Sequence, residues 1–478
     1  MRALLTAAVL LATLTAAARA DSVFYIRGGG DGHGIGMSQY GAYGYALHGA
    51  DYRFILGHYY QGTSLGTISP RQTVRVLLAT GPASFSGAGT ISGSRKHLAP
   101  ATTYTVTVKG ADLVLTTAAG KKVGTFAAPL TVSGPASLSL GGHGTYRGSL
   151  QFSPGAGGVQ TVNVVGLDDY VRGVVAAEMP SSWAPAALEA QAVAARTYAI
   201  TTNVNGPGYD LYPDTRSQMY GGVSSETAAT DAAVAATSGQ IVTYDGKPAV
   251  TYFFAASGGH TESIQNVWAG AAPEPWLVGV PDPYDSAGQN PYHTWGSQMS
   301  ITAAARKLGR LVKGSLVGIQ VTRRGLSPRI VQAQVVGTRG STTVSGSQLQ
   351  GIFGLDDTWA SFTTITTTDP LGTLSGTVFP APTSGSVTVQ AQTGGAWHTV
   401  ARVAVSGSGA YTTRLPAGRY RIVDGSLEGP AVTVGRHVSV SRLLRVPGFV
   451  ACRHQTLTFT LPDARGTVKI APATPTRC

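Results

Sequence analysis

The residue best suited to acid–base chemistry in this sequence is Glu178, which follows the apolar segment 174–177 and precedes Met179 and Pro180. A carboxyl group among valine, alanine and methionine side chains is poorly solvated, and desolvation raises its pKa toward the range in which it can donate a proton. The competing interpretation is a surface glutamate at the end of a short apolar run. Spacing alone does not separate the two, so the surrounding elements have to be considered.

The segment behind Glu178 predicts a helix that begins near Pro185 and runs to about Ala199. Proline suits a first helical turn because it lacks the amide hydrogen that would go unpaired there. One stripe of this helix carries small side chains, which suit close packing against a sheet. Further helices are expected at about 227–236 and 300–311.

Most of the remaining chain alternates between apolar and polar residues. Between residues 75 and 165 this alternation marks short strands separated by Gly, Ser and Asn. Beyond residue 370 similar strands recur at regular spacing, which indicates a small β-sandwich of the immunoglobulin-like kind. The predicted fold class is α+β and β-rich: a domain of mixed strands and short helices, followed by a C-terminal β-sandwich.

Four segments in one order resemble the SpoIID/LytB family, which includes the stage II sporulation protein D. They are residues 178–180 with 190–199, then 217–222, 252–262 and 266–270. Members of that family with demonstrated activity are lytic transglycosylases, and the glutamate before Met-Pro is their catalytic residue. The resemblance implies this role for Glu178, a substrate made of peptidoglycan glycan strands, and no cofactor.

A fifth family segment, residues 30–42, lies at an unusual place in the chain. In the family this glycine-rich block closes the domain at its C-terminal end, whereas here it comes first. Its usual neighbour resembles residues 351–358 and Phe362. A circularly permuted domain explains this order, since domain termini often lie close together at the surface. We therefore expect residues 30–63 to pack beside residues 341–362.

The chain is expected to divide into four parts. Residues 1–20 have the charged start, apolar stretch and Ala-Arg-Ala pattern of a secretory signal peptide. Residues 21–362 form the SpoIID-like domain, made of the displaced block 21–66, a β-rich part 73–165 and a catalytic core 166–362. Residues 363–370 read as a linker and residues 371–478 as the tail domain.

Further residues are expected to line the substrate site beside Glu178. Two glycine-rich loops, at 30–36 and 257–259, allow a sugar to approach the backbone closely. The predicted substrate-binding residues are Arg196, Gln218, Tyr252, Ser257, His260, His33, Ser38 and Gln39.

Several of these residues have a structural alternative. Arg196 either orients a substrate carboxylate or pairs with Glu189, two helical turns earlier. His260 either lines the cleft or has a structural role, and the residues of the first loop either complete the cleft wall or hold a tight turn. A metal shared by the histidines of the two loops is the least favoured alternative.

Metal binding is not expected elsewhere. Some relatives bind zinc through Cys and His, but the matching positions here are Tyr212, Arg216 and Ser217, which offer no soft ligands. The two cysteines of the chain, Cys452 and Cys478, are expected to form a disulfide in an oxidising compartment.

The composition indicates where the protein works. The 478 residues include 63 glycines and carry a formal net charge of +12. Outside a cell this charge favours attraction to anionic wall polymers, although it also serves solubility alone. The basic residues are scattered without interleaved aromatics, which argues against nucleic acid. With no long apolar run after the signal peptide, we expect a secreted or wall-bound protein without a membrane span.

Two functions remain open besides transglycosylation. Most glycoside hydrolases need two carboxyl groups, and this sequence offers one well-placed glutamate, although Glu262 or Asp169 could be recruited for plain hydrolysis. The other alternative is a non-catalytic wall-binding protein that stimulates a cell-wall amidase, as the LytB name in the family implies.

Overall fold

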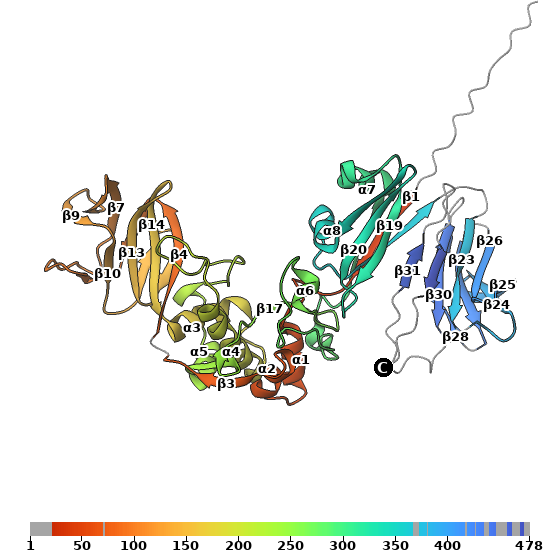
Figure 1. The fold of residues 1–478 in the computed structure, drawn as a ribbon, viewed down its shortest axis with the longest axis horizontal. Helices are drawn as coiled ribbons and strands as arrows, with labels where there is room; N and C mark the ends of the chain where they lie inside the picture. The colour runs from red at the N-terminus through yellow and green to blue at the C-terminus, as the bar shows by residue number, and fades with distance from the viewer. Residues whose placement is uncertain are drawn as a thin grey trace, which may run out of the picture.

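The computed structural model describes residues 22–69, 72–366, 372–379, 381–415, 418–425, 427–434, 439–445, 457–460 and 469–472. The expected signal peptide, the expected disulfide between Cys452 and Cys478, and residues 367–370 of the expected linker lie outside these residues. Strands outnumber helices along the described chain, and they form several small sheets around a helical centre (Figure 1). This arrangement confirms the predicted β-rich α+β class.

The β-rich part consists of two sheets joined by one core. The alternation predicted for β4 is present, because Val74, Val76 and Leu78 are buried while their neighbours are more exposed. The first sheet has the order β4-β14-β13-β10-β6 and the second β12-β11-β5-β7-β8-β9. Their strands are β4 (Thr73–Gly81), β5 (Ala83–Ser86), β6 (Thr90–Ile91), β7 (Tyr104–Lys109), β8 (Asp112–Thr117), β9 (Lys122–Ala127), β10 (Leu130–Ser133), β11 (Leu138–Leu140), β12 (Gly144–Tyr146), β13 (Ser149–Gly155) and β14 (Gly158–Gly166).

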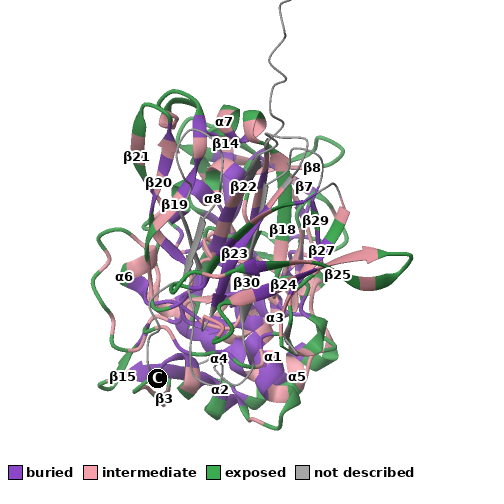
Figure 2. Ribbon diagram, turned by 90° about the vertical axis from the view of Figure 1, so that its right-hand side faces the viewer, coloured by how far each residue is buried: buried purple, intermediate pink, exposed green. Residues whose placement is uncertain are grey.

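The helical centre is built around α4 (Pro185–Thr201), which begins at the predicted proline. The sequence suggested that one stripe of α4 packs on a sheet. Instead α4 is buried almost all round, because it is surrounded by four helices and by β15 (Gln240–Tyr244). Figure 2 shows α4 and α1 largely in the colour of buried residues. The surrounding helices are α1 (Gln39–Leu47), α2 (Tyr52–Tyr59), α3 (Leu167–Glu178) and α5 (Ala228–Ala236), the last of which was also predicted.

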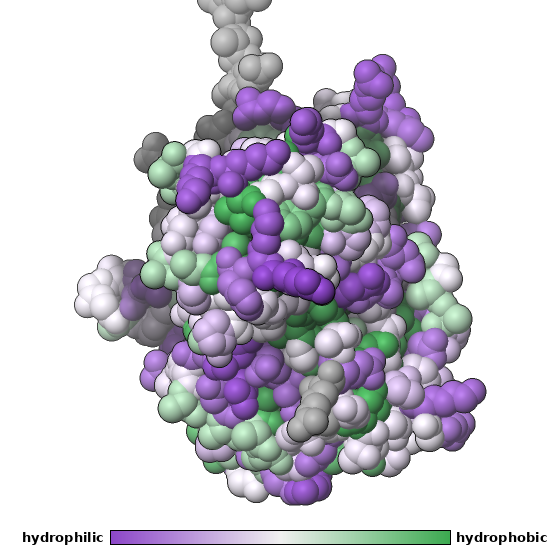
Figure 3. Space-filling model, turned by 90° about the vertical axis from the view of Figure 1, so that its left-hand side faces the viewer, coloured by the Kyte–Doolittle hydropathy of each residue, from purple (hydrophilic) through white to green (hydrophobic). Residues whose placement is uncertain are grey.

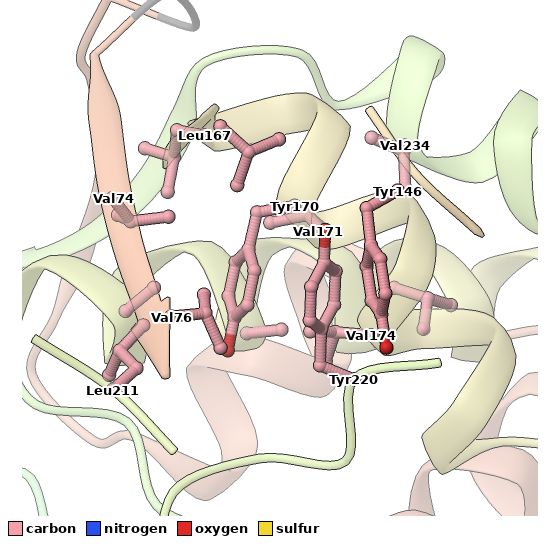
Figure 4. Packing of buried hydrophobic residues seen from close by; sticks show 14 of the residues in the cluster. Val74, Val76, Tyr146, Leu167, Tyr170, Val171, Val174, Leu211, Tyr220 and Val234 are labelled. Atoms are coloured by element: carbon pink, nitrogen blue, oxygen red, sulfur yellow. The ribbon is translucent and has the colours of Figure 1, made fainter. Parts of the chain in front are cut away.

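The first turn of α3 joins the helical centre to the β-rich part. Tyr170 on α3 packs against Tyr220, with 4.8 Å between the ring centroids, and Tyr220 packs against Tyr146 of β12. Val74 and Val76 of β4 lie against the same cluster (Figure 4). Because this packing fixes the axis of α3, it also fixes where the last residue of the helix, Glu178, is placed.

The N-terminal strand β1 (Ser22–Gly28) is the central strand of a third sheet, between β18 (Trp295–Ser300) and β22 (Ala360–Thr366). The amide of Gly32 donates to the carbonyl of Asp356 at 3.0 Å, so the glycine-rich block and residues 356–362 are adjacent as predicted. The remainder of the prediction is wrong, since α1 and α2 pack on α4 instead. The expected linker also begins too early, because Thr363–Thr366 belong to β22.

The other elements complete the described chain. The face seen in Figure 3 intersperses hydrophilic and hydrophobic residues. Among the described residues, no helix has the length and apolar character needed to cross a bilayer. The remaining elements before the tail are β2 (Met37–Ser38), β3 (Ser64–Thr67), η1 (Gly222–Ser224), β16 (Lys247–Pro248), β17 (Phe253–Phe254), α6 (Ile264–Val267), η2 (Ala287–Gln289), α7 (Ile301–Leu308), η3 (Gly309–Leu311), β19 (Leu316–Arg324), β20 (Ile330–Gly337), β21 (Gly340–Ser345) and α8 (Gly346–Phe353).

In the described part of the tail, two larger sheets share an apolar core of residues such as Leu374, Val389 and Ile422, and β31 pairs with β32 in a third sheet. One sheet has the order β26-β23-β30, and the other contains β25, β24, β27, β28 and β29. The strands are β23 (Gly372–Phe379), β24 (Ser386–Thr393), β25 (Ala396–Ala404), β26 (Ala410–Leu415), β27 (Gly418–Asp424), β28 (Leu427–Glu428), β29 (Val432–Val434), β30 (Ser439–Arg445), β31 (Leu457–Thr460) and β32 (Lys469–Pro472).

Candidate active site

Glu178 is the last residue of α3 and lies where three segments meet. Met179 behind it is extended, with φ −125° and ψ 143°, and turns the chain away from the helix axis. The start of α1 and the loop 217–221 approach the carboxyl group from outside α3. The side chain is half-buried rather than freely hydrated.

Both carboxylate oxygens of Glu178 accept hydrogen bonds. The backbone amide of Met219 donates to Oε1 at 2.7 Å, and the side-chain amide of Gln39 donates to Oε2 at 3.5 Å. Burial raises the pKa of Glu178 above its ordinary value, and these two hydrogen bonds partly oppose the shift because they favour the charged form. The environment therefore favours a protonated carboxyl at a higher pH than a solvated glutamate would allow.

Ser38 positions Gln39 for this contact. The hydroxyl of Ser38 caps α1 by accepting from the amide of Gly41 at 3.1 Å, and its side chain is fully buried. Gln39 is thus the first residue of α1 and points at Glu178. Of the two residues predicted to bind substrate here, Gln39 belongs to the site, whereas Ser38 is a structural cap.

Arg196 and Gln218 are buried inside the domain. The guanidinium of Arg196 has no exposed surface and bonds to Asp168 at 2.5 Å and to the carbonyl of Gln240 at 3.0 Å. The suggested pair with Glu189 is therefore wrong, and contact of Arg196 with a substrate carboxylate does not fit this burial. Gln218 donates to the hydroxyl of Tyr170 at 3.1 Å, next to the residue whose amide bonds Glu178.

His33 and Tyr252 belong to an aromatic cluster between the two glycine loops. The ring of Tyr252 lies edge-on to Trp268 at 4.7 Å and to Tyr198 at 5.9 Å. Burial, together with the nearby Glu178, raises the pKa of Tyr198. His33 is 5.5 Å from Trp268 between ring centroids, and its Nδ1 accepts from the amide of the residue two positions later. Burial and the positive charge of Arg329 lower the pKa of His33 to about 4, so the ring is neutral and holds the turn.

Ser257 forms hydrogen bonds with a buried pair of aspartates. Its hydroxyl lies 2.7 Å from Asp282 and 2.9 Å from Asp285, and all three side chains are almost completely buried. Burial, together with the charge of Asp285, raises the pKa of Asp282 to about 7. This pair was not predicted, because a short Asp-Pro-Tyr-Asp segment carries no sign that it will be buried against α1.

His260 lies beside a second buried network. Its Nδ1 is 2.6 Å from the carbonyl of Thr261, and its own carbonyl accepts from Arg329 at 2.6 Å. Arg329 also pairs with Asp357 at 2.6 Å, and this pair joins the second glycine loop to the segment before β22. These contacts favour the structural alternative for His260.

The positions at which some relatives bind zinc are occupied by other contacts. Arg216 lies over the ring of Tyr212 at 3.7 Å, and the hydroxyl of Ser217 accepts from the amide of Tyr212. A cavity of about 360 Å³ lies elsewhere, lined by Ala136, Ser137, Arg147, Gly148, Asp169 and Val223. Glu178 does not line this cavity, so the cavity is separate from the candidate site at the end of α3.

Comparison with known proteins bears on this site. Residues 155–244, which include Glu178 and its partner Met219, match the SpoIID family, described as Stage II sporulation protein. The chain is 33% identical over 215 residues to Stage II sporulation protein D of Bacillus subtilis (strain 168). The resemblance to the SpoIID family found in the sequence is thus confirmed for this segment of the chain.

Other relatives extend this result. An uncharacterized protein of Brachyspira hyodysenteriae, BHWA1_00569, is 43% identical over 138 residues, and the Amidase enhancer of Bacillus subtilis is 37% identical over 115 residues. The three alignments cover 41%, 28% and 24% of this chain, in the order given. They cover 60%, 37% and 15% of the relatives themselves, so the chain spans less than two thirds of each.

Proposed function

We propose that this protein is an exported lytic transglycosylase that cleaves the bond between N-acetylmuramic acid and N-acetylglucosamine in peptidoglycan, with Glu178 as the general acid and base. The observation that carries the proposal is the half-buried carboxyl of Glu178, whose pKa is raised by desolvation and whose two oxygens both accept hydrogen bonds. A carboxyl group of this kind keeps its proton to a higher pH than a solvated one and can donate it to a substrate.

In this proposal the two oxygens of Glu178 have different tasks. The amide of Met219 can only donate, so it holds Oε1 as an acceptor and leaves the acidic proton on Oε2. Gln39 donates to Oε2 and so favours the ionised form that follows proton transfer. The side chain is thereby held in one orientation in both protonation states.

The reaction needs one carboxyl group in two successive roles. Oε2 of Glu178 gives its proton to the glycosidic oxygen, and the bond from that oxygen to the anomeric carbon breaks. The ionised carboxylate then takes the proton of the 6-hydroxyl of N-acetylmuramic acid as that oxygen attacks the anomeric carbon. The products are a shortened strand and a 1,6-anhydro end, and the glutamate is protonated again.

The two carboxylates that hydrolysis could recruit are occupied elsewhere. Glu262 is only 1% exposed and accepts hydrogen bonds from the amides of Leu326 and Ser327, both at 3.0 Å. Asp169 faces Arg172 at 3.6 Å and lines the separate cavity. A site with one available carboxyl group favours the intramolecular attack over hydrolysis with two carboxyl groups.

A second candidate function follows from the likeness to the Amidase enhancer of Bacillus subtilis. In this alternative the chain binds the wall without cleaving it and stimulates a cell-wall amidase. The formal net charge of +12 fits wall binding in either function.

Mass spectrometry of digested glycan separates these functions. Purified peptidoglycan is incubated with the protein, and the released fragments are weighed with and without chemical reduction. Transglycosylation gives anhydro ends that resist reduction, hydrolysis gives reducing ends, and an amidase enhancer gives neither unless an amidase is added. Absence of anhydro fragments at every pH between 4 and 8 would overturn the proposal.

A further inference from the structure

Four aromatic side chains gather beside Glu178 without a structural use for their polar ends. Trp183 stacks on Tyr43 with ring centroids 4.6 Å apart and only 4° between the ring planes. Tyr40 contacts Trp183 at 4.9 Å and Tyr292 at 6.2 Å. We call Tyr40, Tyr43, Trp183 and Tyr292 the aromatic shelf.

The aromatic shelf is connected to the candidate active site on two sides. Tyr40 directly follows Gln39, which bonds Glu178. Trp183 lies five residues after Glu178, a length that spans at most about 18 Å when fully extended. The amide of Trp183 donates to the carbonyl of Pro180 at 3.0 Å, and this turn brings Trp183 closer to the carboxyl group than the extended length.

The polar ends of the shelf are available to a ligand. Within the described part of the chain, the indole N–H of Trp183 and the hydroxyls of the three shelf tyrosines bond to no other residue and are not buried. Two other tryptophans differ in this respect. The indole N–H of Trp276 donates to Val250 at 2.9 Å, and that of Trp295 donates to Gly30 at 2.8 Å.

These features match the needs of a sugar ring. The face of an aromatic ring is electronegative and attracts the C–H groups on one face of a pyranose, while phenol and indole groups bond the sugar hydroxyls. The stack of Tyr43 on Trp183 holds the indole in place before binding, so little side-chain entropy is lost when a ligand arrives. Tyr292 is 38% exposed and forms the outer edge of the aromatic shelf.

We propose that the aromatic shelf is a glycan-binding subsite, which stacks one sugar of the strand next to the bond that Glu178 cleaves. This inference rests on the proposed function for its substrate class, because the glycan strand is the ligand that must extend from Glu178. The shelf fixes which bond of a long strand reaches the carboxyl group.

Binding is measured on the Glu178→Gln protein, so that no substrate is consumed. The probes are a tetramer of β-1,4-linked N-acetylglucosamine and glycan strands freed of their peptides, titrated by calorimetry. We expect Trp183→Leu and Tyr292→Ala each to weaken binding about five- to tenfold. Phe54→Ala is the matched control, since Phe54 is 57% exposed on α2 and contacts Tyr45 and His58 rather than the shelf.

Activity and fold are measured on the same substitutions in the chain with intact Glu178. Loss of the subsite raises KM for the strands with a smaller change in kcat, because the carboxyl group is untouched. Circular dichroism and the thermal midpoint identify a variant that fails to fold. If Trp183→Leu fails to fold, the Kd and KM of Tyr292→Ala and Tyr43→Leu decide whether the shelf binds glycan.

The outcomes keep the two proposals apart. Cleavage with unchanged Kd and KM in folded shelf variants overturns the subsite and leaves the proposed function standing. Shelf-dependent binding by a protein that releases no anhydro product supports the subsite and overturns the proposed function. If the shelf variants lose a purified amidase in a pull-down but keep the glycan, the surface docks a protein and the subsite is overturned.

Discussion

At the scale of single residues, the proposed chemistry depends on a carboxyl group of Glu178 that is desolvated but still within reach of the substrate. Burial alone would leave its charged form without support, but the amide of Met219 stabilises that form at 2.7 Å. The carboxyl group can therefore cycle between acid and base without moving. A solvated glutamate would lose its proton at a lower pH, and a fully buried one would not reach the substrate.

The first prediction concerns Glu178→Gln. The amide side chain has the same shape and its oxygen can accept from Met219, so the fold is retained, whereas the exchangeable proton is lost. We expect formation of anhydro ends to fall at least about 100-fold, measured by mass spectrometry of peptidoglycan digests. The matched control is Glu189→Gln on α4, where activity is unchanged. Residual activity within tenfold of the original chain would contradict the assignment.

A second prediction concerns Gln39→Leu and the pH profile. The hydrogen bond from Gln39 favours the charged form of Glu178 and lowers its pKa, so its loss raises that pKa further. The acid form then persists to higher pH, and the alkaline limb of kcat/KM shifts upward while the maximal rate falls. A profile of kcat/KM between pH 4 and 9 measures both effects. A lower rate without any shift of the limb would give Gln39 a purely structural role.

Gln39 and Glu178 were both predicted from the sequence as site residues, but the contact between them was not. Glu178 and Gln39 are 139 residues apart, and no local pattern reports a pairing over that distance. The same limit explains the error at Arg196. Helical periodicity offered Glu189 as its partner, but the packing of α3 against α4 brought Asp168 instead.

At the scale of elements, the N-terminus of α1 carries Gln39 and is seated on a buried pair of carboxyl groups. A Cβ atom at Gly41 would lie 2.1 Å from Oδ2 of Asp282, so only glycine permits this approach. Ser38, the cap of α1, is 3.4 Å from Asp285. Ser38 and Gly41 thus lie directly against the acidic pair. The sequence does not show this contact, and the segment was therefore predicted to line the substrate site.

The third prediction concerns stability and Asp282→Asn. Because the pKa of Asp282 is raised to about 7, its favourable contribution is complete below pH 4 and is lost as the pH rises through 7. The asparagine variant has no such loss, so it is more stable than the original chain at pH 8, by at most about 4 kcal/mol.

Urea unfolding at pH 5 and pH 8 measures this difference. The exposed Asp112→Asn on β8 is the control, and it leaves the pH dependence of the unfolding free energy as it was. Equal loss of stability between the two pH values in the original chain and in Asp282→Asn would show that Asp282 is ionised throughout this range.

At the scale of the whole molecule, the sequence predicted most of the elements but few of their neighbours. Period-two alternation located strands such as β4 and β14, and Pro185 located the start of α4, because both signals are local. The resemblance placed residues 30–63 beside residues 341–362, but it did not predict that β1, which precedes this block, is the central strand of a sheet. The packing of α1 and α2 on α4 was not predicted either, because nothing in their sequence specifies this partner.

The last prediction tests the displaced order of the chain. Ser22 and Thr366 face each other in the register of β1 and β22, so the start of one strand lies opposite the end of the other. A two-residue Asn-Gly turn is short enough to connect antiparallel strands at such a position. A permuted chain that begins at Gln72, runs to Thr366, and continues through Asn-Gly into residues 22–69 should therefore fold.

The comparison is with residues 22–366 in their present order. We expect the two chains to unfold within a few degrees of each other and to release the same anhydro fragments, because the contacts of β1 and of Gln39 are preserved. A chain of residues 72–366 without the block lacks the central strand and the partner of Glu178, and it should neither fold cooperatively nor cleave. If the permuted chain behaved like this truncated one, the order of residues 22–69 before the β-rich part would be a requirement of the fold rather than a rearrangement that it tolerates.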